Sequence, residues 1–461
     1  MDRTRRSIDR AWLAAVGALA LLAWAPVALE DTWLYAATGR WVVENSAIPR
    51  TDPFSWTSAG EPWQSNGWLW GVLLWGAWSI GTFAAIAVLK PLFVVLLAVV
   101  LRTGARAMGS REGPAAVASL VGVLAVFPWL VERPQLASYL LAPVVTVLAA
   151  RAPGARRPWL SAIAVFAVTA AWVNLHSVAL SAIPVIAAAG AGAVWDARRD
   201  GPIARPLVAA GSVVAAAVLG TLVNPWGVGV WTHAVEVRSQ SSGTISEWEP
   251  LWRSGAAGWL LLGAIGVCLV VAHRWGASRR LAVALPLLAT AVMAVDAIRS
   301  VPVFVVVAAV LLPALTPASS RSIVRPQVLD VGAVALLVVA LVLAVPRVAS
   351  TGEPAAGTPV AATSSLPSGC RLLNDYRFGN WVMWDRPDVP VSDDGRNDLH
   401  GDTSTLDGWL RGGPDAVEQL TAAGVDCVLV APDAALVDDL TPAGWEVVGR
   451  DGSAVALRRP G

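Results

Sequence analysis

The sequence is poor in charged residues and nearly without lysine. Charged residues make up 15% of its 461 residues, and Lys90 is the only lysine. A typical soluble domain carries roughly 25% charged residues. Hydrophobic residues reach 56%, the mean hydropathy is +0.59 and the net charge is +1. These values exclude a string of soluble domains, give no sign of nucleic-acid binding and favour an integral membrane protein.

Cysteines and nucleotide-binding motifs are also scarce. The three cysteines, Cys268, Cys370 and Cys427, are too few to indicate a disulfide framework. We interpret Cys370 and Cys427 as unpaired small apolar residues, with a bridge between them as the alternative. The sequence has neither a Walker motif nor a Rossmann glycine pattern, which argues against the binding of a soluble nucleotide.

Long apolar runs are the dominant feature of the chain. Runs of about 16–20 residues form helices that can cross ~30 Å of hydrocarbon. The first run follows a basic N-terminal segment, and we interpret it as a retained helix. We expect eleven transmembrane helices, at roughly 11–29, 82–101, 114–130, 135–150, 159–174, 177–195, 206–223, 256–272, 281–297, 300–315 and 328–346.

The apolar stretch 66–80 decides the predicted topology. Four tryptophans, at 68, 70, 75 and 78, favour a helix lying at the membrane–water interface. If this stretch does not cross the membrane, eighteen arginines fall on one side of the membrane. The inter-helix loops of the other side hold six, namely Arg40, Arg50, Arg133, Arg238, Arg253 and Arg299. This asymmetry predicts a multi-pass plasma-membrane protein with a cytoplasmic N-terminus and an extracytoplasmic C-terminal tail.

The predicted organisation has three parts. A transmembrane domain covers 1–346 and contains a long first external loop at 30–80. A linker rich in Pro, Gly, Ala, Ser and Thr covers 347–368. A small extracytoplasmic α/β domain covers 369–461, with a strand and helix in 370–384, a buried strand in 424–432 and a hairpin around Asp451 and Gly452.

Two adjacent carboxylates, Glu30 and Asp31, stand at the outer end of the first helix. Such a pair at a hydrocarbon boundary is costly unless it is paired, solvated or used. Apolar residues at helical spacing follow and indicate a short interfacial helix that ends near Asn45 and Pro49. Asp31, with Glu30 as the fallback, is our candidate for a general base that acts on a hydroxyl group. The alternative is an acidic helix boundary solvated by water.

From Asp31 to Trp63 the sequence reads D-x-W-x5-G-R-W-x6-I-P-x2-D-P-F-S-W-T-x2-G-x-P-W. This pattern resembles a bacterial family of GT-C-type membrane glycosyltransferases, related to the protein O-mannosyltransferases and aminoarabinose transferases. The resemblance covers most of the chain. It continues in the segments 132–135, 172–176, 224–227, 247–248, 299–302 and 394–396.

The resemblance implies a GT-C-like helical domain and a donor in which a sugar is linked to polyprenyl phosphate. It further implies inverting transfer, on the outer side of the membrane, to a glycan, lipid or protein acceptor. Related sequences often carry histidines where this chain has Leu34 or Tyr35 and Asn66. We therefore expect no metal, no histidine-assisted step in the first loop and no cofactor.

The candidate substrate-binding residues are polar or aromatic positions expected on the outer side. Arg133, Arg253 and Arg299 suit a lipid phosphate, with headgroup binding or ion pairing, such as Asp296 with Arg299, as the alternative. The other candidates are Arg50, Asp52, Trp63, Trp68, Asn174, His176, Glu247 and Arg396.

Two other functions fit part of these observations. A transporter or flippase for a lipid-linked glycan would show symmetric repeats and helices broken at mid-membrane, for which we find no convincing pattern. A non-catalytic protein of cell-envelope assembly would use its tail for binding.

Overall fold

The chain forms two compact units in a computed structural model, which describes residues 2–28, 31–241, 245–317, 326–400 and 403–460. The helical unit comprises Met1–Ala25 and Ala87–Ala349. The loop–tail unit comprises Pro26–Ile86 and Ser350–Gly461. The first external loop therefore folds together with the C-terminal tail, although the whole helical unit separates them in sequence.

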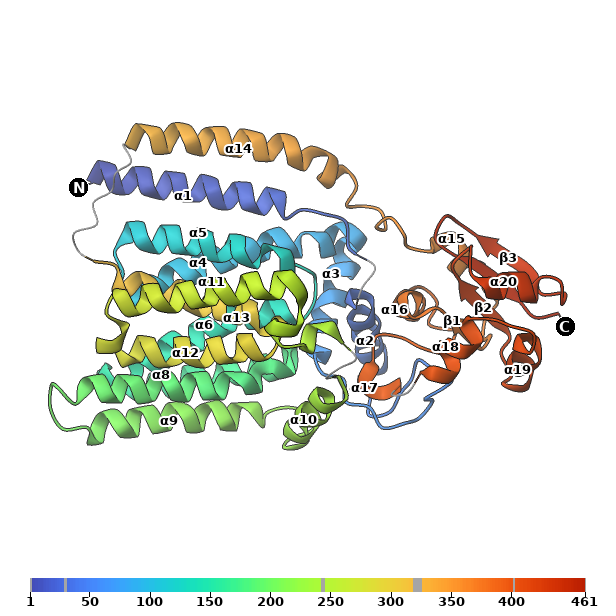
Figure 1. Ribbon diagram of the computed structural model, residues 1–461, viewed down its shortest axis with the longest axis horizontal. Helices are drawn as coiled ribbons and strands as arrows, with labels where there is room; N and C mark the ends of the chain where they lie inside the picture. The colour runs from blue at the N-terminus through green and yellow to red at the C-terminus, as the bar shows by residue number, and fades with distance from the viewer. Residues whose placement is uncertain (1, 29–30, 242–244, 318–325, 401–402, 461) are drawn as a thin grey trace. The chain divides into compact units, whose positions relative to one another are not determined.

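Long helices make up the helical unit (Figure 1). Helix α1 runs beside α14, and α8 lies beside α12. Helix α7 packs against α9. The helices are α1 (Asp2–Leu22), α4 (Leu89–Ala107), α5 (Glu112–Val126), α6 (Gln135–Arg151), α7 (Pro158–Leu175), α8 (Ala182–Ala197), α9 (Ala204–Thr221), α10 (Gly229–Ser241), α11 (Gly255–Arg274), α12 (Leu281–Asp296), α13 (Val301–Leu311) and α14 (Pro326–Ala349).

Each of the eleven predicted spans overlaps a helix of this unit, which confirms the multi-pass helical fold. Among the described residues, nine helical stretches are long and apolar enough to cross a membrane. They include α3 (Trp68–Ala87) and leave out three predicted spans, α1, α4 and α12, of which α12 is a shorter apolar helix. Helix α10 lies in the segment 224–255, between the predicted spans 206–223 and 256–272, where we predict no helix.

The tryptophan-rich helix α3 contains a kink. Its backbone leaves helical geometry at Gly81 and at Thr82, where φ is 52°. A positive φ is uncommon for a β-branched residue, so this is a marked break in the helix. The break falls between the predicted interfacial stretch 66–80 and the predicted span that begins at residue 82. By length and composition alone, α3 is apolar enough to cross a membrane.

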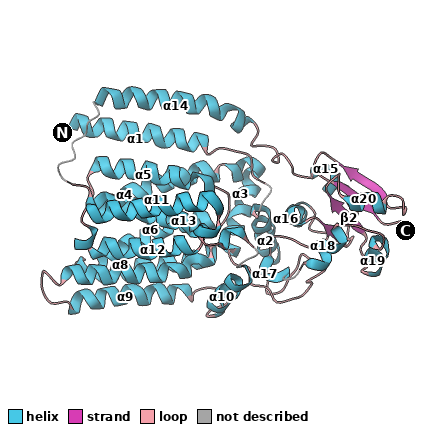
Figure 2. Ribbon diagram, in the orientation of Figure 1, coloured by secondary structure: helices cyan, strands magenta, loops and turns pink. Residues whose placement is uncertain are grey.

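A four-stranded sheet with the order β1-β2-β4-β3 forms the end of the loop–tail unit (Figure 2). Strands β1 and β2 are parallel, whereas β4 is antiparallel to both β2 and β3. The strands are β1 (Leu372–Asn374), β2 (Cys427–Val430), β3 (Glu446–Arg450) and β4 (Val455–Arg458). The helices are α2 (Thr32–Asn45), α3, α15 (Val360–Ser364), α16 (Tyr376–Asp385), α17 (Asn397–His400), α18 (Ser404–Leu410), α19 (Ala416–Ala422) and α20 (Ala435–Leu440). The predicted α/β character of the tail is confirmed.

Helix α16 packs against the first-loop helices through aromatic side chains. The carboxylate of Asp375 accepts a hydrogen bond from the backbone of Arg377 and so caps the start of α16. The ring of Trp381 lies 5.0 Å from that of Trp33 in α2, edge to face. Large aromatic rings bury much apolar area and favour this geometry, which explains why the first loop folds with the tail.

Cys370 and Cys427 form a disulfide, with their Cα atoms 6.0 Å apart. Our interpretation of two unpaired residues was therefore wrong. Cys370 precedes β1 and Cys427 begins β2, and the parallel pairing of these strands brings the two thiols together. This pairing depends on the sheet, so it was not evident from the spacing of the cysteines in the sequence.

Candidate active site

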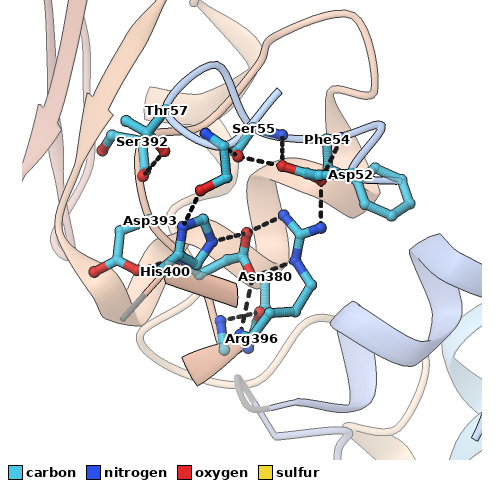
Figure 3. A network of polar contacts seen from close by, with 12 residues as sticks. Asp52, Phe54, Ser55, Thr57, Asn380, Ser392, Asp393, Arg396 and His400 are labelled. Carbon is cyan, nitrogen blue, oxygen red and sulfur yellow. Dashed lines mark hydrogen bonds and ion pairs between the residues drawn. The ribbon is translucent and has the colours of Figure 1, made fainter. Parts of the chain in front are cut away.

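A buried arginine joins the first external loop to the tail. Arg396 is 2% exposed. Its Nε and Nη2 atoms donate to the two carboxylate oxygens of Asp394 at 2.7 and 2.6 Å. Its Nη1 atom forms an ion pair with Asp52 of the first loop (Figure 3). Removing one partner of a buried ion pair costs about 3–5 kcal/mol, because the remaining charge is left uncompensated.

Asp52 is also held by the backbone of its own loop. One carboxylate oxygen accepts from the amide of Phe54 at 2.9 Å, and the other accepts from the amide of Ser55 at 3.2 Å. The ring of Trp63 lies 4.9 Å from the guanidinium carbon of Arg396. Asp52, Trp63 and Arg396, three residues singled out in the sequence, thus come together in one buried cluster.

His400 extends this cluster toward Ser58. Its Nε2 atom lies 3.0 Å from Asp394, and its Nδ1 atom lies 3.4 Å from the Ser58 hydroxyl. Burial would lower the pKa of His400, but the hydrogen bond and the charge of Asp394 outweigh it and raise the pKa. The order Asp–His–Ser is that of a hydrolase triad. Here Asp394 is engaged by Arg396 and the Ser58 contact is long, so the geometry favours a structural role.

Asp31 lies at the start of α2 but does not cap it. An aspartate at this position commonly accepts a hydrogen bond from the first turn of its helix. The Asp31 side chain makes no such capping bond. Its Oδ1 atom instead accepts from the Nδ2 atom of Asn380, in α16, at 3.3 Å. The predicted base is therefore tied to the tail domain.

Other first-loop candidates occupy varied positions. Arg50 is exposed, and its carbonyl accepts from the amide of Trp63 at 2.9 Å. Trp68 is half-buried at the start of α3. Glu30, the fallback base, lies outside the described residues. Substrate binding by Arg50, Asp52, Trp63, Trp68 and Arg396 remains a prediction.

In the helical unit, the segment 246–249 contacts two of the arginines that we predict to bind phosphate. Glu247 forms an ion pair with Arg133 at 3.5 Å. The guanidinium of Arg299 lies over the ring of Trp248, 4.1 Å from its centroid. Arg133 and Arg299 thus each contact one of two adjacent residues of this segment.

Three other residues bear on the predicted phosphate site. Asp296, considered above as a partner for Arg299, forms an ion pair with Arg238 at 2.6 Å. Arg253 is exposed at the end of a short 3-10 helix, Leu251–Arg253. Its role in phosphate binding remains a prediction.

His176 is buried and Asn174 is half-buried, and both join helices of the helical unit. His176 is 7% exposed, and its Nδ1 atom lies 2.7 Å from the Ser138 hydroxyl. That hydroxyl accepts from the indole of Trp172 at 2.8 Å. The amide of Asn174 donates to the carbonyl of Val223 at 2.6 Å. These contacts are those of residues that join helices, and ligand binding by either residue remains a prediction.

No group of three or more His, Cys, Asp or Glu side chains within the described ranges is arranged to hold a metal ion. The expectation of a reaction without a metal or cofactor remains a prediction.

Asn380 was not predicted from the sequence. It is 7% exposed and lies on the buried face of α16, in the run FGNWVMW. A single amide among aromatic residues on a buried helix face is a signal that could have identified it, because a buried polar group requires a hydrogen-bonding partner. The partner itself, Asp31, is too distant in sequence to be recognised.

No protein-family model matches the sequence, and neither does any curated protein sequence. The structure is similar to that of the oligosaccharyltransferase of Archaeoglobus fulgidus in its apo form, with a TM-score of 0.61 and 12% sequence identity. The similarity covers 92% of this chain and 69% of the archaeal one. At such low identity the similarity establishes the fold. The chain therefore has the GT-C-type fold of membrane glycosyltransferases, the fold that the sequence resemblance implied.

Proposed function

We propose that the protein is a membrane glycosyltransferase that moves a sugar from polyprenyl phosphate to an extracytoplasmic glycan, lipid or protein. The GT-C-type fold across 92% of the chain supports this reading. The observation that carries it furthest is the carboxylate of Asp31, which is held by Asn380 instead of capping its own helix. A carboxylate oriented in this way is suited to general-base catalysis.

In the proposed reaction, Asp31 takes the proton of an acceptor hydroxyl as its oxygen attacks the anomeric carbon of the sugar. The bond from that carbon to the phosphate oxygen breaks, and its electron pair leaves with polyprenyl phosphate. Attack opposite to the leaving group inverts the anomeric configuration. The products are the glycosylated acceptor and polyprenyl phosphate, and Asp31 releases its proton to water.

The leaving phosphate gains negative charge as the bond breaks, so fixed cations accelerate the step. Arg133 and Arg299 are the proposed ligands of this phosphate, because planar guanidinium groups suit phosphate oxygens. In the structure Arg133 is paired with Glu247, as in the alternative of ion pairing, and Arg299 lies over Trp248, so phosphate binding by both residues remains a proposal. Arg253 is a further candidate at the surface of the same unit.

An Asp31→Asn variant tests the function. Membranes of a host that lacks this gene would carry wild-type protein, Asp31→Asn, or the control Glu418→Gln, which changes an exposed carboxylate on α19. The probe is a panel of short polyprenyl-phosphate hexoses and pentoses, tritiated in the sugar. We expect the wild type and Glu418→Gln to move label into the envelope fraction, and Asp31→Asn to be slower by about 10²–10⁴-fold.

Full transfer by a well-folded Asp31→Asn protein would remove Asp31 as the base. Failure of the wild type with every lipid-phosphate sugar of the panel would count against the proposed donor. Movement of the intact lipid-linked sugar across the membrane, without release of polyprenyl phosphate, would indicate a transporter instead.

A further inference from the structure

Asn380 contacts two parts of the loop–tail unit at once. Its Oδ1 atom accepts from the amide of Gly395 at 2.9 Å, and its Nδ2 atom donates to Asp31 at 3.3 Å. These two bonds use opposite ends of one amide group. Flipping the amide would place a donor against a donor and an acceptor against a carboxylate, so the bond to Gly395 fixes which end faces Asp31.

The backbone around Asn380 is packed too tightly for side chains at two glycines. A Cβ atom on Gly379 would lie 2.0 Å from the carbonyl oxygen of Asp393. A Cβ atom on Gly395 would lie 2.8 Å from Nδ2 of Asn380 and 2.9 Å from Oδ1 of Asp31. The loop 393–396 therefore rests directly on α16, and any side chain at Gly395 would displace either Asn380 or Asp31.

The residue after Gly395 fixes this loop in place. Arg396 forms two hydrogen bonds to Asp394 and an ion pair to Asp52. These contacts are buried, and they hold the amide of Gly395 within reach of Asn380. The chain of contacts thus runs from Asp52 to Arg396, along the backbone to Gly395, and from Gly395 through Asn380 to Asp31, entirely within the loop–tail unit.

From these contacts we infer that Asn380 is a positioning residue for Asp31, oriented by the backbone of Gly395 and the anchored loop 393–396. This inference rests on the proposed function, in which Asp31 is the base. The amide donor of Asn380 favours the ionised form of Asp31, which is the form that accepts a proton. The hydrogen bond from Asn380 also fixes the Oδ1 atom of Asp31, and so it fixes the direction in which the Oδ2 atom points.

The test compares Asn380→Asp, Asn380→Leu and the control Asn45→Asp. Asn380→Asp keeps an acceptor for Gly395 but places a carboxylate beside Asp31, whereas Asn380→Leu removes both bonds. Asn45 is exposed at the far end of α2, about 20 Å from Asp31 by helix length. Its new charge is therefore screened from Asp31 by salt.

The readout requires no substrate. A water-soluble carbodiimide with glycinamide labels protonated carboxyl groups, and peptide mass spectrometry measures labelling of Asp31 as a function of pH. We expect Asn380→Asp to move the labelling midpoint upward by about one pH unit or more, because two neighbouring carboxylates resist joint ionisation. Asn380→Leu should shift it upward by less, and Asn45→Asp should match the wild type.

Transfer assays on the same variants complete the test. We expect Asn380→Leu to slow transfer by about 10–100-fold at neutral pH, with Asn380→Asp recovering activity only at a pH above its shifted midpoint. An unchanged labelling midpoint in a folded Asn380→Asp protein would overturn the inference even if Asp31→Asn abolishes transfer. Conversely, a shifted midpoint together with an active Asp31→Asn protein would overturn the proposed function and leave the contact intact.

Discussion

At the scale of single residues, the pKa values of two adjacent aspartates in the loop 393–396 are shifted in opposite directions. Burial raises the pKa of Asp393 to about 6, and the nearby charge of Asp394 adds to this effect against the opposing charge of His400. Burial also acts on Asp394, but Arg396 and His400 outweigh it and hold the pKa of Asp394 below its usual range. The difference follows from the partners of the two carboxylates, since Arg396 donates two side-chain hydrogen bonds to Asp394.

The raised pKa of Asp393 predicts a pH dependence of stability. The folded protein binds the proton of Asp393 more tightly than the unfolded chain does. The protonated side chain therefore contributes its full share to the free energy of unfolding below about pH 4. This contribution is lost as the pH rises through about 6. Between pH 4 and 6 the wild type should therefore lose unfolding free energy on the order of 1–2 kcal/mol, seen as a fall in its thermal midpoint. We expect Asp393→Asn to remove this part of the fall.

Differential scanning fluorimetry of the purified protein in detergent measures this effect. The exposed Asp438→Asn substitution on α20 is the matched control, and it should leave the slope between pH 4 and 6 unchanged. An Asp393→Asn protein with the same slope as the wild type would show that Asp393 is not the group responsible.

Part of the candidate site was predictable at this scale and part was not. Asp31, Asp52 and Arg396 stood out because charges at a membrane boundary or in a polar loop require an explanation. Their relation did not, since Asp52 and Arg396 are separated by 344 residues. Asn380 was missed because a lone asparagine carries no charge and lies in a run that reads as an ordinary buried helix face.

At the scale of elements, α2 and α3 approach each other through glycines. A Cβ atom on Gly39 would lie 2.0 Å from the backbone carbon of Gly71, and one on Gly71 would lie 2.4 Å from the carbonyl of Tyr35. The two helices are therefore in backbone contact at this point. Because Asp31 stands at the start of α2, this contact also helps to fix the position of the proposed base.

Adding one methyl group at this contact should separate the helices. We expect Gly39→Ala to lower the unfolding free energy by about 1–3 kcal/mol through overpacking. Gly76→Ala, in the neighbouring helix α3, meets nothing within 4 Å and serves as the control. Its effect should be neutral or stabilising by up to about 1 kcal/mol, since alanine favours a helix over glycine. Chemical denaturation in detergent distinguishes the two, and equal effects would contradict the close contact.

The elements themselves followed from hydrophobic pattern more reliably than their partners did. Eleven apolar runs became eleven helices, and the hairpin around Asp451 became β3 and β4. Helix α10 was missed because its sequence GVWTHAVEVRSQS has no continuous apolar face. The disulfide was missed because the parallel pairing of β1 with β2, which brings Cys370 to Cys427, is a tertiary feature.

At the scale of the whole molecule, the disulfide bears on orientation. Structural disulfides form in oxidising compartments such as the extracytoplasmic space. A bridge between Cys370 and Cys427 therefore agrees with the extracytoplasmic tail that the arginine distribution predicts. The orientation itself remains a prediction.

Impermeant maleimide labelling of intact cells tests this orientation. Cys268 is the free cysteine of the described chain, so the variants are built on Cys268→Ser. We expect Glu418→Cys, on α19, to be labelled in intact cells, and Asp200→Cys, between α8 and α9, to be labelled only after lysis. Both positions are exposed. The reverse pattern would invert the topology and place the candidate base on the cytoplasmic side.

The ion pair between Asp52 and Arg396 also has a consequence for biogenesis. Its two halves lie 344 residues apart. At about 5–20 residues per second, a ribosome needs on the order of half a minute to bridge that interval. Throughout that time the nascent first loop lacks Arg396, the partner of Asp52, and helix α16, whose Asn380 contacts Asp31. We expect a chain released before residue 350 to contain the helical unit but to lack α16 and the loop 393–396, which hold the proposed base, so the proposed site can form only after the tail is translated.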